Sequence, residues 1–399
     1  MYQNIHYDRK KREIHIWDDK TGYHKTPYKP YGFILDSQGH YNDLFGNNMT
    51  KVYNTSEYTP NELSESDVLP ETRYLIDNYL ESEIPSDNHN ILTFDIEVEK
   101  TEEGYSDPMK TANKINAISL YSSVDKQYIA IILDEDNRIS DKVIGNRTII
   151  SVASEKDLLL TFFKYYRDIN PTILTGWNID SYDVPYLYNR SGKIVGKQIA
   201  NSLSPIGIVK KNFTYDEDKE EFSIAGVSCL DYITLYKNFN FSEKPSYSLN
   251  NISLAELGRG KIEYDGDLRT LFNSDIDKFI EYSIVDVELV VEMDKKLDFI
   301  ELARGIAHKG YVPYESVYHS SKFLDGASLA FLRRKGIVAP NKKPKVKLEL
   351  LYTHKKGDTT LSFNIIPPDT PGSGQLKIFK SASSHFKVTY SGYDNNEFT

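Results

Sequence analysis

The sequence has one cysteine, two tryptophans and no long apolar run. A single Cys229 excludes an internal disulfide framework and favours a reducing compartment. No apolar stretch approaches the roughly 20 residues that cross a bilayer, and the N-terminal MYQNIHYDRKKREIHIW lacks the pattern of a secretory signal. We therefore expect a cytoplasmic protein with no membrane partner.

The chain also has too few basic residues to balance its acidic ones, and its formal net charge is −10. This balance argues against non-specific nucleic-acid binding, although clustered metal-binding carboxylates add negative charge without forbidding a local basic groove. With 399 residues, 39% of them hydrophobic and 27% charged, the chain is long enough for two or three globular domains.

The stretch ILTFDIEVEK (91–100) places two carboxylates inside an apolar run. Side chains at positions i and i+2 of a strand point the same way, so Asp95 and Glu97 share a face. Two like charges at that spacing are tolerated if both face water, if one is protonated, or if a cation lies between them. The solvated face of an edge strand remains the alternative interpretation.

A second acidic element is ILTGWNIDSYDVPYLYNR (173–190). The pattern predicts a buried strand, a Gly-Trp-Asn turn and a helix that begins near Asp183, with Pro185 in its first turn. Asp183 could instead be the N-cap of this helix, a role worth about 1 kcal/mol that requires no chemistry.

The third element, residues 275–303, is predicted to be one long helix. Tyr282 and Asp286 are four residues apart and therefore lie on the same face of it. Apolar residues surround Asp286 along the helix, so its carboxylate is expected to be buried. A buried carboxylate needs a metal ion or a hydrogen-bonding partner. The alternative is a plain Tyr282–Asp286 hydrogen bond inside the core.

The remaining elements predict an α/β fold whose sheet has an antiparallel portion. Residues 1–80 alternate short β-like runs with turn residues, and 81–90 reads as a linker. Strand patterns at 115–123 and 127–136 precede a helical pattern at 155–170, which ends before a proline.

Three motifs, FDIEV, GWNIDSYDVPYL and YSIVDVE, resemble the exonuclease motifs of family B DNA polymerases, most closely those of T-even-like bacteriophages. The resemblance runs from about Tyr31 to about Pro344. It implies an RNase H-like (DnaQ-like) 3′→5′ exonuclease with a mixed sheet, which removes mismatched 3′ ends of DNA in the cytoplasm of the host cell. The implied divisions are an N-terminal domain at 1–90, the exonuclease at 91–310, a segment returning toward the N-terminal domain at 311–344 and a lysine-rich β-like tail at 345–399.

The same resemblance assigns a two-metal site. Asp95, Glu97 and Asp286 would hold one ion, Asp95 and Asp183 a second, and Tyr282 would orient the attacking water by hydrogen bonding. Phosphodiester hydrolysis needs a nucleophilic water and a stabilised leaving oxygen, which two divalent ions supply. Oxygen ligands suit Mg²⁺, or alternatively Mn²⁺.

Other matched positions concern the substrate, a single strand or primer 3′ end. Lys261 aligns with a family lysine near the scissile phosphate, or else is a solvated turn lysine. Tyr105 aligns with an aromatic that stacks on a terminal base, and Trp177 and Asn178 belong to the matched turn, although core packing is the alternative for any aromatic. Residues 208–226 read as a β-hairpin, which in the family helps to separate strands and could here be a plain surface hairpin.

The motifs of a polymerase palm are absent from the 399 residues. From residue 341 onward the chain has nine lysines against five acidic residues and resembles no family known to us. We expect no nucleotidyl transfer from these residues alone, and a second polypeptide that carries palm, fingers and thumb, with other replication proteins as further partners. The alternatives are a non-catalytic DNA-binding scaffold that completes a polymerase, or a truncated polymerase product.

Overall fold

A computed structural model of the chain describes residues 1–82, 84–100, 106–213, 220–342, 361–362, 374–381, 384–391, 393–394 and 397–398. The chain divides into two compact units, which are described separately. The first comprises Met1–Asn212 with Glu220–Pro340, and the second comprises Phe213–Lys219 with Asn341–Thr399.

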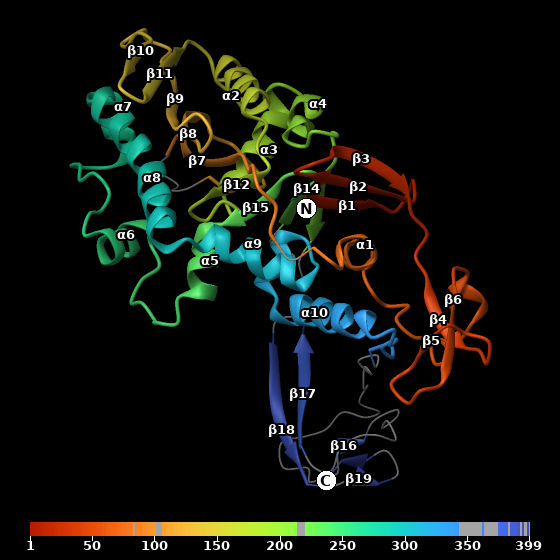
Figure 1. Cartoon of the computed structure of the whole chain (residues 1–399). Helices are drawn as coiled ribbons and strands as arrows, with labels where there is room; N and C mark the ends of the chain where they lie inside the picture. The colour runs from red at the N-terminus through yellow and green to blue at the C-terminus, as the bar shows by residue number, and fades with distance from the viewer. Residues whose placement is uncertain are drawn as a thin grey trace. The chain divides into compact units, whose positions relative to one another are not determined.

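The largest sheet of the first unit has seven strands (Figure 1). Their order across the sheet is β10 (Lys142–Ile144), β11 (Arg147–Val152), β9 (Gln127–Leu133), β8 (Ile115–Ser122), β7 (Ile91–Val98), β12 (Ile173–Gly176) and β15 (Ser228–Asp231). Strand β8 is antiparallel to β7 and β9, whereas β12 is parallel to both β7 and β15. The α/β class with a mixed sheet is therefore confirmed. Since β7, β12 and β15 run the same way, their carboxyl ends meet at one edge of the sheet.

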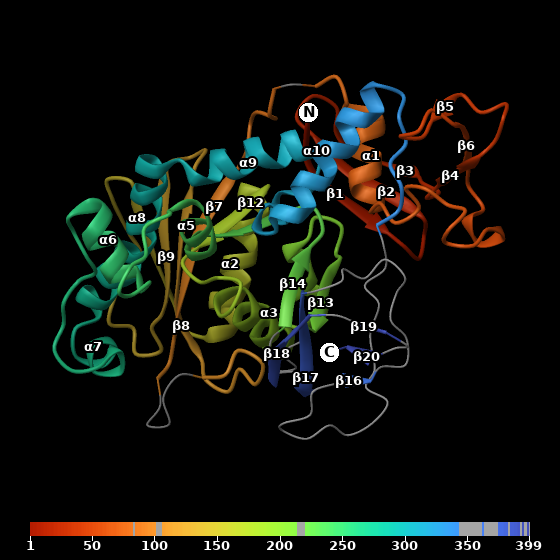
Figure 2. The same ribbon diagram turned by 90° about the horizontal axis from the view of Figure 1, so that it is seen from below.

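Helices cover both faces of this sheet (Figure 2). On one face, α2 (Glu155–Ile169) and α3 (Asp183–Ile194) bury Leu158, Phe162 and Leu187 against Phe94 and Leu120. On the other face, α8 (Ile276–Leu297) packs its apolar residues against β8 and β9. The acidic strand β7 is thus held between two hydrophobic layers.

The first unit also contains shorter helices between residues 197 and 274. They are α4 (Lys197–Ala200), η2 (Asn201–Leu203), α5 (Tyr232–Phe239), α6 (Leu249–Leu257) and α7 (Leu268–Ser274).

The N-terminal residues form two small antiparallel sheets, one 3₁₀-helix and one α-helix. Their elements are β1 (Tyr2–Asp8), β2 (Glu13–Asp18), β3 (Gly22–Pro27), β4 (Gly32–Leu35), β5 (Tyr41–Asn42), β6 (Asn48–Val52), η1 (Thr55–Glu57) and α1 (Pro70–Tyr79). Residues 82 and 84–90 form no helix or strand, as the predicted linker requires.

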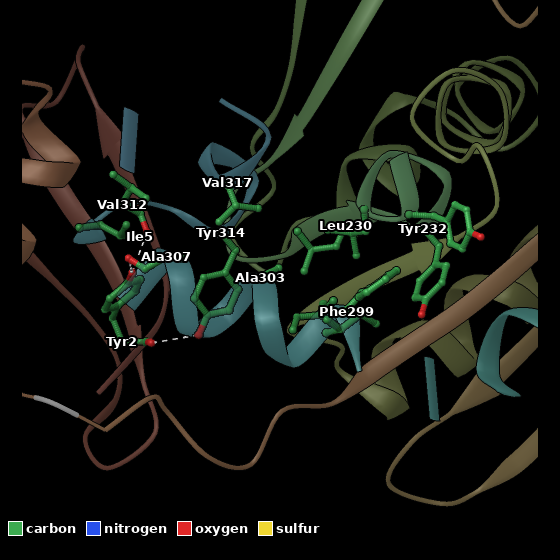
Figure 3. Packing of buried hydrophobic residues seen from close by; sticks show 14 of the residues in the cluster. Tyr2, Ile5, Leu230, Tyr232, Phe299, Ala303, Ala307, Val312, Tyr314 and Val317 are labelled. Carbon is green, nitrogen blue, oxygen red and sulfur yellow. Dashed lines mark hydrogen bonds between the residues drawn. The ribbon is translucent and has the colours of Figure 1, made fainter. Parts of the chain in front are cut away.

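A shared core joins β1 to α9 (Phe299–Gly310) and to η3 (Tyr314–Tyr318), as Figure 3 shows. The Tyr2 hydroxyl lies 2.6 Å from the Val312 carbonyl oxygen and 3.1 Å from that of Ala307, and it donates to both. The Tyr314 hydroxyl donates to the Tyr2 carbonyl at 3.3 Å. These bonds satisfy polar groups that the apolar core would otherwise leave unpaired.

Residues after α9 also contact the N-terminal strands. Helix α10 (Ser320–Arg334) places Arg333 3.1 Å from Glu65, and Ile337 forms a parallel bridge with Asn42. The predicted division of the chain at residues 90, 310 and 344 stays a prediction.

The predicted hairpin at 208–226 contains β13 (Val209–Phe213) and β14 (Glu220–Ile224), which pair as a two-stranded sheet, while its tip lies outside the described residues. In the second unit most of the described residues form strands, as the sequence predicts. They are β16 (Leu361–Ser362), β17 (Gly374–Ser381), β18 (Ser384–Tyr390), β19 (Tyr393–Asp394) and β20 (Glu397–Phe398).

Two features differ from the sequence prediction. The pair β10 and β11 between β9 and α2 was not predicted, and the single helix predicted over 275–303 is wrong. Asp298 adopts a left-handed backbone (φ 56°), a conformation that Asp tolerates better than most residues, and it separates α8 from α9. The Asp294 carboxylate then accepts the backbone N–H of Ile300 at 3.2 Å.

Across the part of the chain that the structure describes, no helix combines the length and the apolar character needed to span a membrane.

Gly176 ends β12 beside β7, where no side chain fits. A Cβ there would lie 2.4 Å from the Phe94 carbonyl oxygen and 2.6 Å from Cγ2 of Ile179. We expect Gly176→Ala to lower the free energy of unfolding by about 1–3 kcal/mol in urea titrations, because the sheet must shift to admit the methyl group.

The matched control is Gly192→Ala in α3, where a Cβ would meet nothing within 4 Å. Because alanine is favoured over glycine inside a helix, Gly192→Ala should raise the free energy of unfolding by about 0.5–1 kcal/mol. Equal effects of the two substitutions would show that the close approach at Gly176 is unimportant.

Candidate active site

Strand β7 carries the first two candidate acids. Asp95 is half-buried and Glu97 is buried, and both side chains line the same cleft. The register between β7 and β8 shifts between Glu97 and Val98, so the strand is irregular just where the acids lie. Such irregularities redirect side chains and are common beside active sites. The solvated edge-strand interpretation is wrong, because β7 lies between β8 and β12.

Helix α8 brings Tyr282 and Asp286 to this strand. Asp286 is 3% exposed, and Nζ of Lys261 lies 2.5 Å from its Oδ2 atom. The same Nζ donates to the Tyr282 hydroxyl at 3.1 Å. Lys261 is therefore not a solvated turn lysine. It supplies a positive charge inside the acidic cluster.

Asp183 lines the same cleft from the start of α3. The helix N-cap is Tyr182, and Asp183 is the first helical residue, so the N-cap interpretation of Asp183 is wrong. Its Oδ1 atom instead accepts the backbone N–H of Ile96 at 3.2 Å. This bond ties the beginning of α3 to the middle of β7, between the two strand acids.

The residues present fit a divalent cation. Asp95, Glu97 and Asp286 each offer one carboxylate oxygen, and these three atoms lie within 4.8 Å of one another. Among the described residues, Oδ1 of Asp286 is buried without a hydrogen-bond partner. Hard oxygen donors of this kind suit Mg²⁺ or Mn²⁺. Asp183 is not part of this group of three, although it lines the same cleft.

Burial raises the pKa of each of these carboxyl groups, and the charges of neighbouring carboxylates add to the rise for Asp95, Glu97 and Asp183. Burial, followed by the charges of Asp183 and Glu97, raises the pKa of Asp95 well above its usual range. Burial and the charge of Asp286 raise the pKa of Glu97 to about 8. Burial likewise raises the pKa of Asp183 to about 7. Metal-free carboxyls in this cleft thus hold protons near neutral pH.

Lys261 and Tyr282 respond to the same charges. Burial alone would lower the pKa of Lys261, but Asp286 and the neighbouring acids raise it above its usual range. Burial and the charges of Glu97 and Asp286 raise the pKa of Tyr282. The lysine therefore stays charged and the phenol stays protonated, able to donate a hydrogen bond.

The cleft around these groups has a volume of about 480 Å³. Trp177 and Asn178 line it from the turn after β12, and the Trp177 Nε1–H donates to the Tyr247 carbonyl at 3.2 Å. Asn178 is exposed and has a left-handed backbone (φ 69°). Tyr105, the predicted base-stacking residue, lies outside the described residues.

Comparison with known proteins identifies the family. Residues 42–252, just over half of the chain, match the family model described as "DNA polymerase family B, exonuclease domain". The chain belongs to the family B DNA polymerases. Its resemblance to that family is therefore confirmed.

Individual family B polymerases match a longer stretch. The DNA-directed DNA polymerase of Escherichia phage RB69 is 32% identical over 295 residues, which are 67% of this chain and 32% of the relative. That of Enterobacteria phage T4 is 31% identical over 297 residues, 69% and 33% of the two chains. DNA polymerase 1 of Sulfurisphaera ohwakuensis is 30% identical over 224 residues, 53% and 23% of the two chains. The match thus spans about a third of each phage polymerase.

Sequence reasoning missed two acids of this family B exonuclease region: Asp267, which lines the cleft, and Asp231, which lies near Asp183. Asp231, the last residue of β15, is 1% exposed, and its charge contributes to the raised pKa of Asp183. A signal was present in LDYITLY, where an acid separates a short apolar strand from a helix. That pattern indicates a helix N-cap. It does not indicate that the same side chain also contacts the turn after β12.

The raised pKa values make metal binding depend on pH. The folded metal-free protein keeps protons that the unfolded chain releases at its ordinary carboxyl pKa values, about 4. Stability from these groups is therefore present below about pH 4 and lost as pH rises through 7 and 8. In EDTA the melting temperature should fall from pH 6 to pH 8, and the rise caused by Mg²⁺ should be larger at pH 8.

Glu97→Gln should weaken the pH dependence of the melting temperature, since it removes one carboxyl group with a raised pKa. Glu135→Gln is the matched control, because Glu135 is exposed and pairs with Lys114. An Mg²⁺-induced shift of equal size at both pH values would contradict the expectation.

Proposed function

We propose that this chain is the 3′→5′ proofreading exonuclease part of a family B replicative DNA polymerase. It would hydrolyse the terminal phosphodiester bond at the 3′ end of DNA. The observation that carries the proposal is the group of three clustered carboxylates, with the unpartnered Oδ1 of Asp286, in a cleft lined by the family motifs. Membership of the exonuclease family supports the same reaction class.

The four carboxylates of the cleft would form two ion sites. Asp95, Glu97 and Asp286 would hold one Mg²⁺, and Asp95 with Asp183 a second, with Mn²⁺ as an alternative ion. When bound, such a pair of ions supplies a water that is nucleophilic at neutral pH and offsets charge on the leaving oxygen.

Tyr282 and Lys261 would act on the water and the substrate. The Tyr282 hydroxyl, with its raised pKa, orients the attacking water through a hydrogen bond rather than by losing its proton. Lys261 compensates part of the charge of Asp286 and offers a cation to the phosphate.

The substrate would be an unpaired 3′ end. Asn178 and Trp177 line the cleft. Tyr105, which aligns with a base-stacking aromatic of the family, would stack on a terminal base. Aromatic side chains and two lysines line the cleft, a combination that suits unpaired nucleotides, whose bases stack on aromatic rings.

We further propose that polymerisation depends on palm, fingers and thumb carried by a second polypeptide, which docks on the N-terminal residues and on the region after Gly310. Both phage relatives are DNA-directed DNA polymerases, and the match covers about a third of each of them. Other replication proteins are proposed as further partners. Co-purification from the natural source tests the idea, and recovery of this chain without any palm-bearing partner would refute it.

Asp95→Ala should abolish digestion of single-stranded DNA in Mg²⁺, with at least a thousand-fold lower rate, because it removes a ligand shared by both ion sites. Its melting temperature in EDTA should be unchanged or higher, since one member of a repelling group is gone.

Asp136→Ala, at an exposed acid after β9, is the control and should retain full activity. A melting temperature that collapses together with the activity of Asp95→Ala would show that Asp95 is structural.

Single strands and mismatched 3′ ends should be digested about ten-fold or more faster than matched duplex ends. Fraying a paired end costs a few kcal/mol before the terminal nucleotide can enter the cleft. Initial rates on labelled oligonucleotides of the same sequence, single-stranded, mismatched and matched, measure this ratio. Equal rates on all three substrates would indicate a general nuclease instead of a proofreading enzyme.

A further inference from the structure

Asp231 lies at the edge of the sheet where the candidate active site forms. It ends β15, and the parallel register pairs it with Gly176, the last residue of β12. Its side chain is almost completely buried. A buried carboxylate is costly unless it is hydrogen-bonded, so its partners indicate its role.

The Asp231 carboxylate joins two segments that are otherwise separate. Its Oδ1 atom accepts the backbone N–H of Ile233 at 3.1 Å and so caps α5. The same Oδ1 accepts the N–H of Asn178 at 2.9 Å, and Oδ2 accepts that of Asp180 at 3.3 Å. Only the first of these three bonds is needed for a helix cap.

The turn held in this way carries the proposed substrate contact. Asn178 has a left-handed backbone, which few residues adopt without support from their surroundings. The Asn178 carbonyl accepts the N–H groups of Ser181 and Tyr182, both at 3.2 Å, and leads directly into α3. Fixing the amides at 178 and 180 therefore fixes the approach to Asp183.

We propose that Asp231 is a positioning residue of the exonuclease site, which holds the 177–180 turn so that Asn178 faces the DNA 3′ end and α3 begins at Asp183. The inference rests on the proposed function. Asp231 touches neither substrate nor metal in this role, and acts through the backbone of the turn.

Asp231→Ser separates positioning from capping. Serine is as good an N-cap as aspartate, so the bond to Ile233 can persist, but its single neutral oxygen cannot also serve the two amides of the turn. We expect kcat/KM on single-stranded DNA with Mg²⁺ to fall about ten- to hundred-fold, the usual worth of hydrogen bonds to a charged group.

Asp134→Ser is the matched control. Asp134 is also buried and directly follows a strand, but its carboxylate accepts from Arg138 at 3.0 Å and from the backbone N–H of Ile139 at 2.8 Å, not from the 177–180 turn. It should lower the melting temperature to a similar degree while kcat/KM stays within about two-fold of wild type. Parallel losses of activity in both variants would overturn the positioning role and leave a purely structural one.

A double-mutant cycle with Asn178→Ala, measured as kcat/KM, distinguishes positioning from a simple loss of stability. If Asp231 acts through Asn178, the second substitution adds less than two-fold in the Asp231→Ser background. The inference would be refuted if the two substitutions lowered kcat/KM by independent factors that multiply in the double variant. Wild-type kinetics of Asp231→Ser would also refute it.

Affinity for a fluorescein-labelled oligodeoxythymidylate with a free 3′ end, measured in EDTA, separates this inference from the proposed function. Asp231→Ser should bind about ten-fold more weakly and Asp134→Ser like wild type. A wild-type protein that binds the oligonucleotide but does not digest it in Mg²⁺ would refute the exonuclease, while the affinity ratio would still test Asp231. Equal affinities of Asp231→Ser and wild type would refute the positioning of the turn.

Discussion

The repulsion among buried carboxylates is the constraint on which the rest of the site depends. Three acids offer oxygens within 4.8 Å of one another, and a fourth lies in the same cleft. Glu97, Asp183 and Asp286 are buried and Asp95 is half-buried, so water screens their charges only in part. One ammonium group, that of Lys261, offsets part of this charge. The scaffold must therefore hold the acids in place against a force that pushes them apart.

Two hydrophobic layers hold the acids in place against this repulsion. Strand β7 lies inside the sheet, and the apolar residues of α8 pack on β8 and β9, so neither element can retreat without exposing apolar surface. The bond from the Ile96 amide to Asp183 and the close approach at Gly176 hold α3 and β12 against β7. The acidic cleft is thus maintained largely by apolar packing.

Much of the site could be predicted because its acids follow local periodicities. Asp95 and Glu97 are two residues apart on a strand, and Tyr282 and Asp286 are four apart on a helix, so the sequence alone places each pair on one face. Recognition of the three motifs then brought the pairs together. The strands β7, β8 and β9 and the helix α2 were likewise predictable from hydrophobic periodicity.

The rest depends on tertiary contacts that no local pattern records. Lys261 lies in a loop, and its partner Asp286 is known only once α8 has docked. Asp231 looks like an ordinary helix cap, because the turn that it holds belongs to a neighbouring strand. The break at Asp298 was invisible for a similar reason, since helical periodicity continues through it and only the backbone conformation shows the end of α8.

The order of these elements along the chain has a consequence for folding. Asp95 and Glu97 are synthesised long before Lys261 and Asp286, and the cluster closes only when α8 packs across the sheet. Contacts so distant in sequence close large loops and form late. Until then the strand acids remain in water, where their repulsion is screened and costs little. The electrostatic strain of the site therefore enters when α8 docks on the sheet, and the apolar surface that α8 buries in the same step offsets it.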